Sequence, residues 1–124
     1  MLPDAEETQK AVVYDSEPAV GALLGYLLER EGFSVLQAHS LNEAMAKCRE
    51  EAGQVYALVC DADVTTAETY LSPLVHNELP HLRVVVLSAG ANPSSLRKCD
   101  GYCMIPKPFA CEQLMSAVRG TVRR

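Results

Sequence analysis

Four short apolar runs of this chain each end on a residue that can bind or receive a phosphoryl group. Asp15 follows AVVY, Asp61 follows YALVC, Ser88 follows RVVVL and Lys107 follows YCMIP. If these runs are strands of a parallel sheet, their carboxyl ends lie along one edge, where residues far apart in the sequence converge. A nucleophilic carboxylate, a second acid for a metal ion, a hydroxyl and an ammonium group would then share one cleft. This combination predicts phospho-aspartate chemistry.

The elements that must position these residues alternate along the chain. Short runs rich in β-branched residues predict five strands, near residues 11–14, 33–37, 55–60, 82–87 and 101–105. Helical patterns lie between them, and this alternation implies right-handed crossover connections. We therefore predict an α/β fold, a single-domain doubly wound five-stranded parallel sheet with helices on both faces.

The first helix is the one that the sequence marks most clearly. Its apolar residues recur at spacings of three and four, at Val20, Leu23, Leu24, Leu27 and Leu28. Ser16 is the expected N-cap, because a serine hydroxyl can accept a hydrogen bond from the first turn. Gly32 is the expected stop, because glycine suits the left-handed residue that ends many helices.

The other helices are marked less strongly. Ser40 and Glu43 have capping-box spacing, so a second helix should begin at Ser40. A last helix is expected from about residue 110 to residue 118. The segments 66–76 and 92–98 are weaker helix predictions.

Length and composition limit what the chain can be. Its 124 residues allow one domain, which we place at 10–124, with the acidic residues 1–9 as a flexible N-terminal arm. The net charge of -5 argues against a nucleic-acid partner, because binding phosphates requires clustered Lys and Arg. No apolar stretch has the length of a membrane span, and MLPDAEETQK does not resemble a signal peptide. We therefore expect a cytoplasmic protein with no membrane partner.

The five cysteines do not suggest a disulfide framework or a zinc site. Their number is odd, and the chain has no CxxC pair. We expect reduced and mostly buried thiols, with Cys60 in the core at the end of its strand.

The segment VVYDSEPAVGALLGYLLEREGFSVLQAHSLNEAM resembles the opening of a response-regulator receiver domain, which usually begins with VVDDEP. Later landmarks follow in order. Asp61 ends the third predicted strand, Ser88 and Ala89 end the fourth, and Lys107-Pro108-Phe109 end the fifth. The resemblance covers nearly the whole chain and implies the flavodoxin-like fold of the CheY-like family.

The resemblance also implies a role for each site residue. Asp61 would accept a phosphoryl group from the phosphohistidine of a sensor histidine kinase or a phosphotransfer protein. Asp15, Asp61 and the backbone carbonyl of Asp63 would hold Mg²⁺, which prefers oxygen ligands. Lys107 would pair with the phosphoryl oxygens, and Ser88 would donate a hydrogen bond to them and move inward as the switch. Such a protein is not an enzyme beyond its own phosphorylation and dephosphorylation.

The signal would pass to another protein by contact. The resemblance implies an output surface formed by the fourth helix, the fifth strand and the fifth helix, used by a downstream protein or a second copy of the chain. It also implies a cis peptide bond before Pro108.

Four departures from the family pattern change these expectations. Ser16 stands where the family usually has its second acidic residue, and a hydroxyl is a poorer Mg²⁺ ligand than a carboxylate. Glu17 is a further candidate ligand, although it is also explained as an acid in the first turn of a helix. The loop ADVTTAET lacks the usual Met-Pro, Met104 replaces a common aromatic residue, and the short interval 88–107 predicts a shortened fourth helix.

Two alternatives follow. In the first, these departures indicate a degenerate receiver that is never phosphorylated and acts by protein binding. In the second, Asp61-Ala-Asp63-Val-Thr65 resembles the DxDxT motif of haloacid-dehalogenase-type phosphatases, with Asp63 as the acid. Those enzymes need a further acidic strand end after the lysine, and Glu112, within a predicted helix, is the sole acid after Lys107. In a receiver, Asp63 would instead be a solvated loop acid or would tune the lifetime of phospho-aspartate.

Overall fold

The sheet has the predicted parallel core and one additional strand. The computed structural model describes residues 9–51, 53–88, 98–99 and 102–119. The strands lie in the order β2-β1-β3-β4-β6-β5. The five parallel strands are β1 (Lys10–Tyr14), β2 (Ser34–Gln37), β3 (Val55–Asp61), β4 (Arg83–Ser88) and β6 (Tyr102–Pro106). The two-residue β5 (Lys98–Cys99) pairs antiparallel with β6 and was not predicted, because two residues are too few to show a periodicity.

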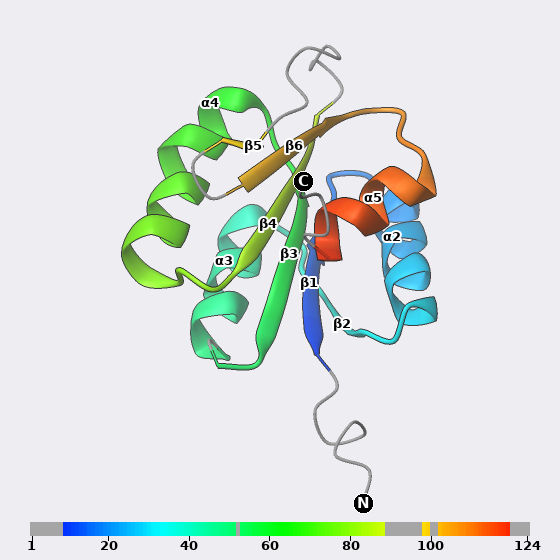
Figure 1. Ribbon diagram of the computed structural model, residues 1–124, viewed down its shortest axis with the longest axis horizontal. Helices are drawn as coiled ribbons and strands as arrows, with labels where there is room; N and C mark the ends of the chain where they lie inside the picture. Colours follow the sequence, from blue (N-terminus) through cyan, green and yellow to red (C-terminus); the bar gives the residue numbers. More distant parts are fainter. Residues whose placement is uncertain (1–8, 52, 89–97, 100–101, 120–124) are drawn as a thin grey trace, which may run out of the picture.

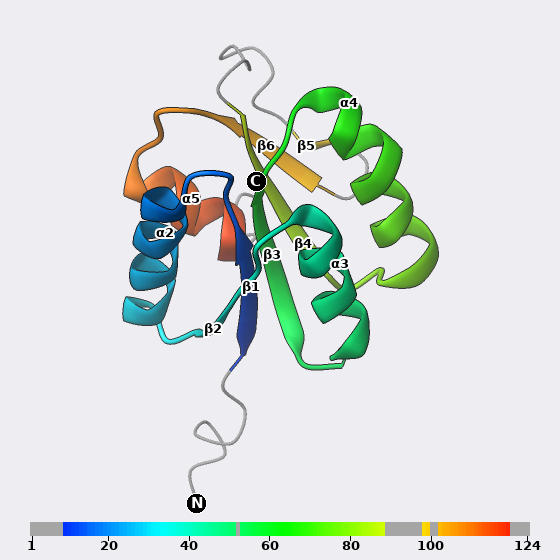
Figure 2. The same ribbon diagram turned by 180° about the vertical axis from the view of Figure 1, so that it is seen from behind.

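Helices cover both faces of the sheet. Helices α2 (Pro18–Arg30) and α5 (Cys111–Arg119) lie on one face, on the right in Figure 1. The other face carries α3 (Leu41–Glu50) and a long helix whose parts are α4 (Val64–Thr66), η1 (Ala67–Leu71) and η2 (Leu74–Glu78), as the reverse view in Figure 2 also shows. This arrangement confirms the doubly wound α/β fold.

The hydrophobic core is divided into two layers by the sheet. In β1, Val12 packs among the residues of α3 and the long helix, whereas Ala11 and Val13 pack among those of α2 and α5. In β3, Leu58 and Val59 divide between the same two layers. Strands that are buried on both faces have near-continuous apolar sequences, which explains the runs recognised in the chain.

Helix α2 begins differently from our prediction and ends as predicted. Its N-cap is Glu17, not Ser16, and the Glu17 side chain makes no capping hydrogen bond. At the other end Gly32 has φ of 99°. The amides of Gly32 and Phe33 donate to the carbonyls of Glu29 and Leu28, at 3.0 and 3.1 Å. These two bonds form a Schellman motif and confirm the stop at Gly32.

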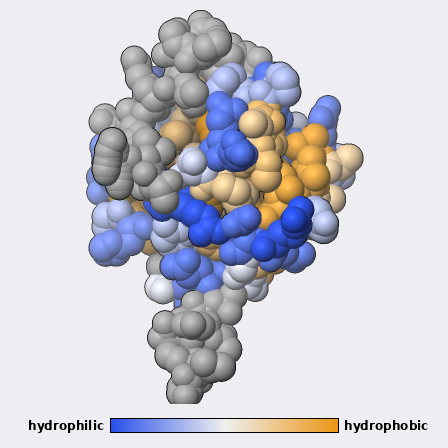
Figure 3. All heavy atoms as spheres, turned by 45° about the vertical axis from the view of Figure 1, so that its right-hand side comes forward, coloured by the Kyte–Doolittle hydropathy of each residue, from blue (hydrophilic) through white to orange (hydrophobic). Residues whose placement is uncertain are grey.

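Fewer of the apolar residues of α2 are buried than their spacing predicted. Leu24 and Leu28 are fully buried, but Leu23 is 50% exposed. Figure 3 shows hydrophobic surface gathered on this side of the molecule. Gly21 and Gly25 complete the buried face, and the Gln37 side chain from β2 donates to the Gly21 carbonyl at 3.1 Å. Small residues therefore let the edge strand contact the helix backbone.

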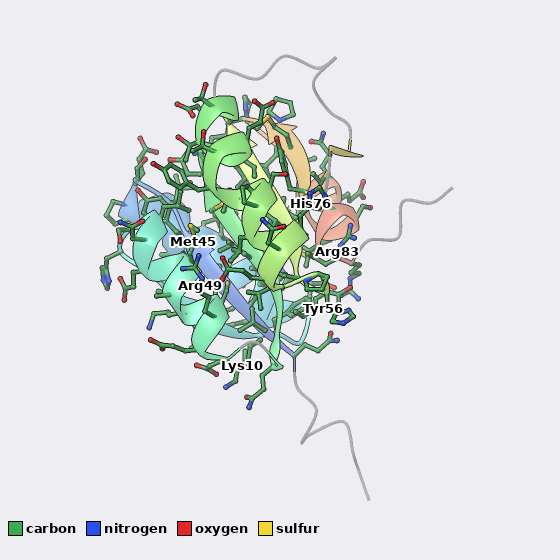
Figure 4. The ribbon with its side chains drawn as sticks, turned by 90° about the vertical axis from the view of Figure 1, so that its left-hand side faces the viewer. Lys10, Met45, Arg49, Tyr56, His76 and Arg83 are labelled. Carbon is green, nitrogen blue, oxygen red and sulfur yellow. The ribbon has the colours of Figure 1, made fainter. Side chains whose placement is uncertain are left out.

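Helix α3 has the predicted cap. The Ser40 hydroxyl accepts a hydrogen bond from the Glu43 amide at 3.0 Å. The Glu43 carboxylate accepts one from the His39 amide, which lowers the pKa of Glu43. At the other end of α3, Arg49 pairs with Glu78 of η2 through its Nε at 2.7 Å, and Figure 4 shows Met45 and Arg49 on the side of α3 next to the long helix.

The weaker helix predictions have different outcomes. Residues 64–78 are helical, which confirms the 66–76 prediction, but η1 and η2 have π-helical hydrogen bonding. The predicted helix at 92–98 and the shortened fourth helix fall outside the described residues, except for Lys98 in β5. The expected arm at 1–9 also lies outside them, except for Gln9. Among the described residues, no helix is both long and apolar enough to cross a membrane.

We predict that two glycine substitutions at the ends of α2 have opposite effects. A Cβ at Gly21 would have Gln37 Oε1 at 3.5 Å and Asp15 Cβ at 3.8 Å, which are ordinary contacts. Gly21→Ala should therefore raise the free energy of unfolding by about 0.5–1 kcal/mol, the usual gain in helix propensity. Gly32→Ala should lower it by about 1 kcal/mol, because its positive φ strains an L-residue. Urea unfolding measures both, and a destabilised Gly21→Ala would show that the contacts to Asp15 and Gln37 cannot adjust.

Candidate functional site

The predicted site residues meet at the carboxyl edge of the sheet. Asp15 follows β1, Asp61 ends β3, Ser88 ends β4 and Lys107 follows β6. The register places Asp61 beside Leu87 and Ser88 beside Pro106, so these strand ends are neighbours. This edge is at the upper end of the sheet in Figure 1. The predicted convergence of the strand ends is confirmed.

The ammonium group of Lys107 lies between two carboxylates. Its Nζ is 3.0 Å from Asp15 Oδ2 and 3.5 Å from Asp61 Oδ1. The Asp15 side chain is fully buried, and those of Lys107 and Asp61 are 20% and 22% exposed. Burial disfavours the charge on Lys107, but the hydrogen bond to Asp15 and the charges of both aspartates outweigh it and raise the pKa of Lys107. Two negative charges and one positive charge therefore share the site.

Both oxygens of the buried Asp15 carboxylate have partners. Oδ2 accepts a hydrogen bond from Lys107, and Oδ1 accepts one from the Glu17 amide at 2.9 Å. A buried carboxylate is tolerated when it is paired and hydrogen-bonded. The second bond also folds the loop between β1 and α2 around Asp15, while Glu17 itself lies exposed at the start of α2.

Ser16 bonds to the predicted nucleophile. Its hydroxyl donates to Asp61 Oδ2 at 2.6 Å, and its amide lies 3.3 Å from the same oxygen. Our sequence reasoning missed this contact, because it treated Ser16 as a helix cap and as a lost metal ligand. The position of Ser16 directly after Asp15, in the loop that faces the end of β3, was the signal that could have identified it.

Asp63 caps the helix that follows it. Its carboxylate accepts a hydrogen bond from the Thr66 amide at 2.7 Å, which lowers the pKa of Asp63. Its backbone carbonyl accepts one from the Ala67 amide at 3.0 Å. A carboxylate with a lowered pKa is a poor proton donor near neutral pH. This environment argues against the phosphatase alternative, in which Asp63 acts as the acid.

The remaining landmarks lie at the ends of β4 and β6. Ser88 is buried, and its carbonyl accepts a hydrogen bond from the Lys107 amide at 3.1 Å. The peptide bond between Lys107 and Pro108 is cis, as the resemblance implied. Met104 is buried in the core layer of α3.

The cysteines are partly as predicted. Cys48 and Cys60 are fully buried free thiols. Burial raises the pKa of Cys48 to about 12 and also raises that of Cys60, so neither is a ready nucleophile near neutral pH. Cys103 is half-buried and Cys111 is exposed, so the thiols are less uniformly buried than expected.

The donor set fits a magnesium ion that has few protein ligands. Asp15 and Asp61 supply two carboxylates to one place, and the Asp63 carbonyl has a second lone pair. Within the described ranges, no group of three or more His, Cys, Asp or Glu residues is arranged to hold a metal ion. Mg²⁺ commonly uses one or two carboxylates and keeps several waters, so this chemistry remains compatible with it.

Comparison with known proteins identifies the fold through structure. No family model and no curated protein matches the sequence. CheY from Borrelia burgdorferi, solved in a complex with CheX, BeF₃ and Mg²⁺, has a TM-score of 0.77 and 18% identity, over 100% of this chain and 96% of that chain. CheY4 from Vibrio cholerae has a TM-score of 0.71 and 18% identity, over 93% of this chain and 99% of that one.

A third similar structure is a Burkholderia pseudomallei response regulator solved with a phosphorylated aspartic acid, a calcium ion and citrate. It has a TM-score of 0.67 and 24% identity, over 89% of this chain and 66% of that chain. At these identities the likeness establishes the fold. This chain therefore has the fold of the response-regulator receiver domains.

Proposed function

We propose that this chain is a receiver that accepts a phosphoryl group on Asp61 from a sensor histidine kinase or a phosphotransfer protein. The observation that supports this most is the position of Lys107 Nζ between the Asp15 and Asp61 carboxylates. Phosphoryl transfer depends mainly on positioning and on neutralising charge. A lysine beside a carboxylate nucleophile, on the same edge of the sheet as the hydroxyl residue Ser88, meets both needs.

In the proposed transfer, an oxygen of Asp61 attacks phosphorus while the bond from phosphorus to the donor's histidine nitrogen breaks. The electron pair of that bond stays with the donor nitrogen. Lys107, 3.5 Å from Asp61 Oδ1, would pair with the incoming phosphoryl oxygens. Asp15 would keep the ammonium group in place, because it binds Nζ from the buried side.

Asp15, Asp61 and the Asp63 carbonyl would hold Mg²⁺ in this proposal. When bound, the ion would supply positive charge to the transferred group. The Borrelia CheY complex contains BeF₃ and Mg²⁺, and the Burkholderia regulator carries a phosphorylated aspartic acid, which makes the chemistry plausible for the fold. Ser16 replaces an acid with a neutral hydroxyl, so we expect weaker metal binding than in receivers with two adjacent acids.

The output of the proposed receiver would be a protein contact. Ser88 would bind the new phosphoryl group and move with the segment after β4. The proposed surface combines β6, α5 and the helix that the resemblance implies between β4 and β6. It would bind a downstream protein or a second copy of the chain. That helix is not the element labelled α4, and residues 89–97, where it is expected, lie outside the described residues. The Borrelia CheY, solved with CheX, is an example of a receiver with a protein partner.

The degenerate receiver remains a second candidate, and one observation favours it. The charged groups of the site already satisfy one another, since Asp61 accepts a hydrogen bond from Ser16 and lies beside Lys107. Carboxylates that already have partners within the protein depend less on a metal ion to compensate their charge. Such a chain would bind partners through its surface alone.

Phosphorylation of the isolated chain distinguishes the two candidates. We expect incubation with acetyl phosphate and Mg²⁺ to add one phosphoryl group, detected by intact-mass spectrometry. Asp61→Asn should abolish the adduct, because an amide is not a nucleophile at this oxygen. Asp63→Asn, which changes a neighbouring helix cap, should retain it. The absence of any adduct on the unaltered chain, with acetyl phosphate consumed no faster than in buffer alone, would favour the degenerate receiver.

A second prediction concerns the missing acid. Ser16→Asp would place a third carboxylate beside Asp15 and Asp61, so like charges should destabilise the metal-free chain by roughly 1 kcal/mol. The same variant should gain a larger Mg²⁺-dependent rise in Tm than the unaltered chain, since each added oxygen ligand strengthens binding. Ser16→Asn, of the same shape without the charge, is the control. Equal Mg²⁺ shifts in all three proteins would contradict a metal site at these residues.

A third prediction follows from the raised pKa of Lys107. A double-mutant cycle with Asp15→Asn and Lys107→Gln should give a coupling energy of about 1–3 kcal/mol at neutral pH. Because the folded pKa lies above the ordinary lysine value of 10.5, the coupling should be fully present below that pH and decline as pH rises through the folded value. Denaturant unfolding across this range measures it. A coupling already lost at roughly pH 9 would contradict the assigned charge state.

A further inference from the structure

The two oxygens of Asp61 have different surroundings. Oδ2 accepts the Ser16 hydroxyl at 2.6 Å and faces the Ser16 amide at 3.3 Å. Oδ1 lies 3.5 Å from Lys107 Nζ. One oxygen is therefore held by hydrogen-bond donors of Ser16, and the other faces the cation that would meet a phosphoryl group.

We propose that Ser16 is a positioning residue that presents Oδ1 as the phosphoryl acceptor and shortens the lifetime of phosphorylated Asp61. This inference rests on the proposed function. Its basis is that a hydrogen bond to a charged carboxylate is stronger than one to a neutral acyl oxygen. The Ser16 hydroxyl therefore favours the unphosphorylated side chain over the acyl phosphate.

The effect is exerted in the hydrolysis step. A water oxygen attacks phosphorus and forms a new P–O bond, while the bond from phosphorus to Asp61 Oδ1 breaks. The electron pair of that bond returns to the carboxylate, where the charge is shared with Oδ2, and a proton of the water passes to the released phosphate. Because Oδ2 gains negative charge during this step, donors directed at it lower the barrier.

The loop that contains Ser16 is held in place independently of Asp61. The Asp15 carboxylate accepts the Glu17 amide at 2.9 Å and Lys107 at 3.0 Å, and Asp15 directly follows β1. Pro18 then begins α2. Ser16 is therefore fixed between two anchored residues, and its donors are oriented before phosphorylation. An acid at this position would accept hydrogen bonds and could not make the same contact.

The test is the half-life of the phosphorylated chain after the donor is removed. The unaltered protein, Ser16→Ala, Ser16→Thr and Ser116→Ala are phosphorylated with acetyl phosphate and Mg²⁺, desalted and followed by intact mass. Ser16→Ala should lengthen the half-life about five- to tenfold, the rate equivalent of the difference between a charged and a neutral hydrogen bond. Ser16→Thr keeps a hydroxyl and should restore a half-life near that of the unaltered chain. Ser116 is exposed on α5, so Ser116→Ala should have no effect.

Each outcome separates this inference from the proposed function. An adduct with the same half-life in Ser16→Ala and the unaltered chain overturns the role of Ser16 and leaves the receiver intact. An adduct that accumulates only in Ser16→Ala supports the inference, because the unaltered chain then loses the group as fast as it forms. No adduct on any of the four proteins overturns both. A shorter half-life in Ser16→Ala also overturns the proposal, since it would assign Ser16 to protecting the phosphoryl group.

Discussion

The ion pair between buried Asp15 and Lys107 is the interaction on which the rest of the site depends. A fully buried carboxylate is costly unless a cation and hydrogen bonds compensate it. Here the cation comes from a residue 92 positions later in the chain. In the sheet β3 and β4 lie between β1 and β6, so the pair links the ends of two strands that are not neighbours. The charge pattern and the strand order therefore support each other.

This pair also defines the surroundings of Asp61. Lys107 pairs with the buried Asp15, and its ammonium group also lies near Asp61 Oδ1. The Ser16 hydroxyl donates a hydrogen bond to the other oxygen of Asp61, Oδ2. The site has two carboxylates and one ammonium group. Both proposals, a receiver that binds Mg²⁺ weakly and a domain that acts without phosphorylation, start from this set of charges.

Several parts of the structure were predictable because their signals are local. The apolar runs marked the five parallel strands to within about one residue, and the need for a positive φ marked Gly32 as the end of α2. The convergence of Asp15, Asp61, Ser88 and Lys107 followed from the topology of a parallel sheet. The exposure of Leu23 was not predictable from the apolar residues alone. Gly21 and Gly25 form part of the buried face of α2, and glycines are not counted when a helix face is assigned from hydrophobic spacing.

The sequence by itself determined the fold class, the edge at which the chemistry lies and the residue types available there, because periodicity, turn residues and strand ends are encoded by neighbours in the chain. Only the tertiary structure decided how those groups share their hydrogen bonds. The contact of Ser16 with Asp61 joins residues 45 positions apart. It depends on the direction of one hydroxyl in a loop and on the exact end of another strand, and neither is encoded by a local pattern. The same holds for Asp63. The sequence showed that it lies two residues after the nucleophile, but only the folded chain shows that its carboxylate caps the following helix.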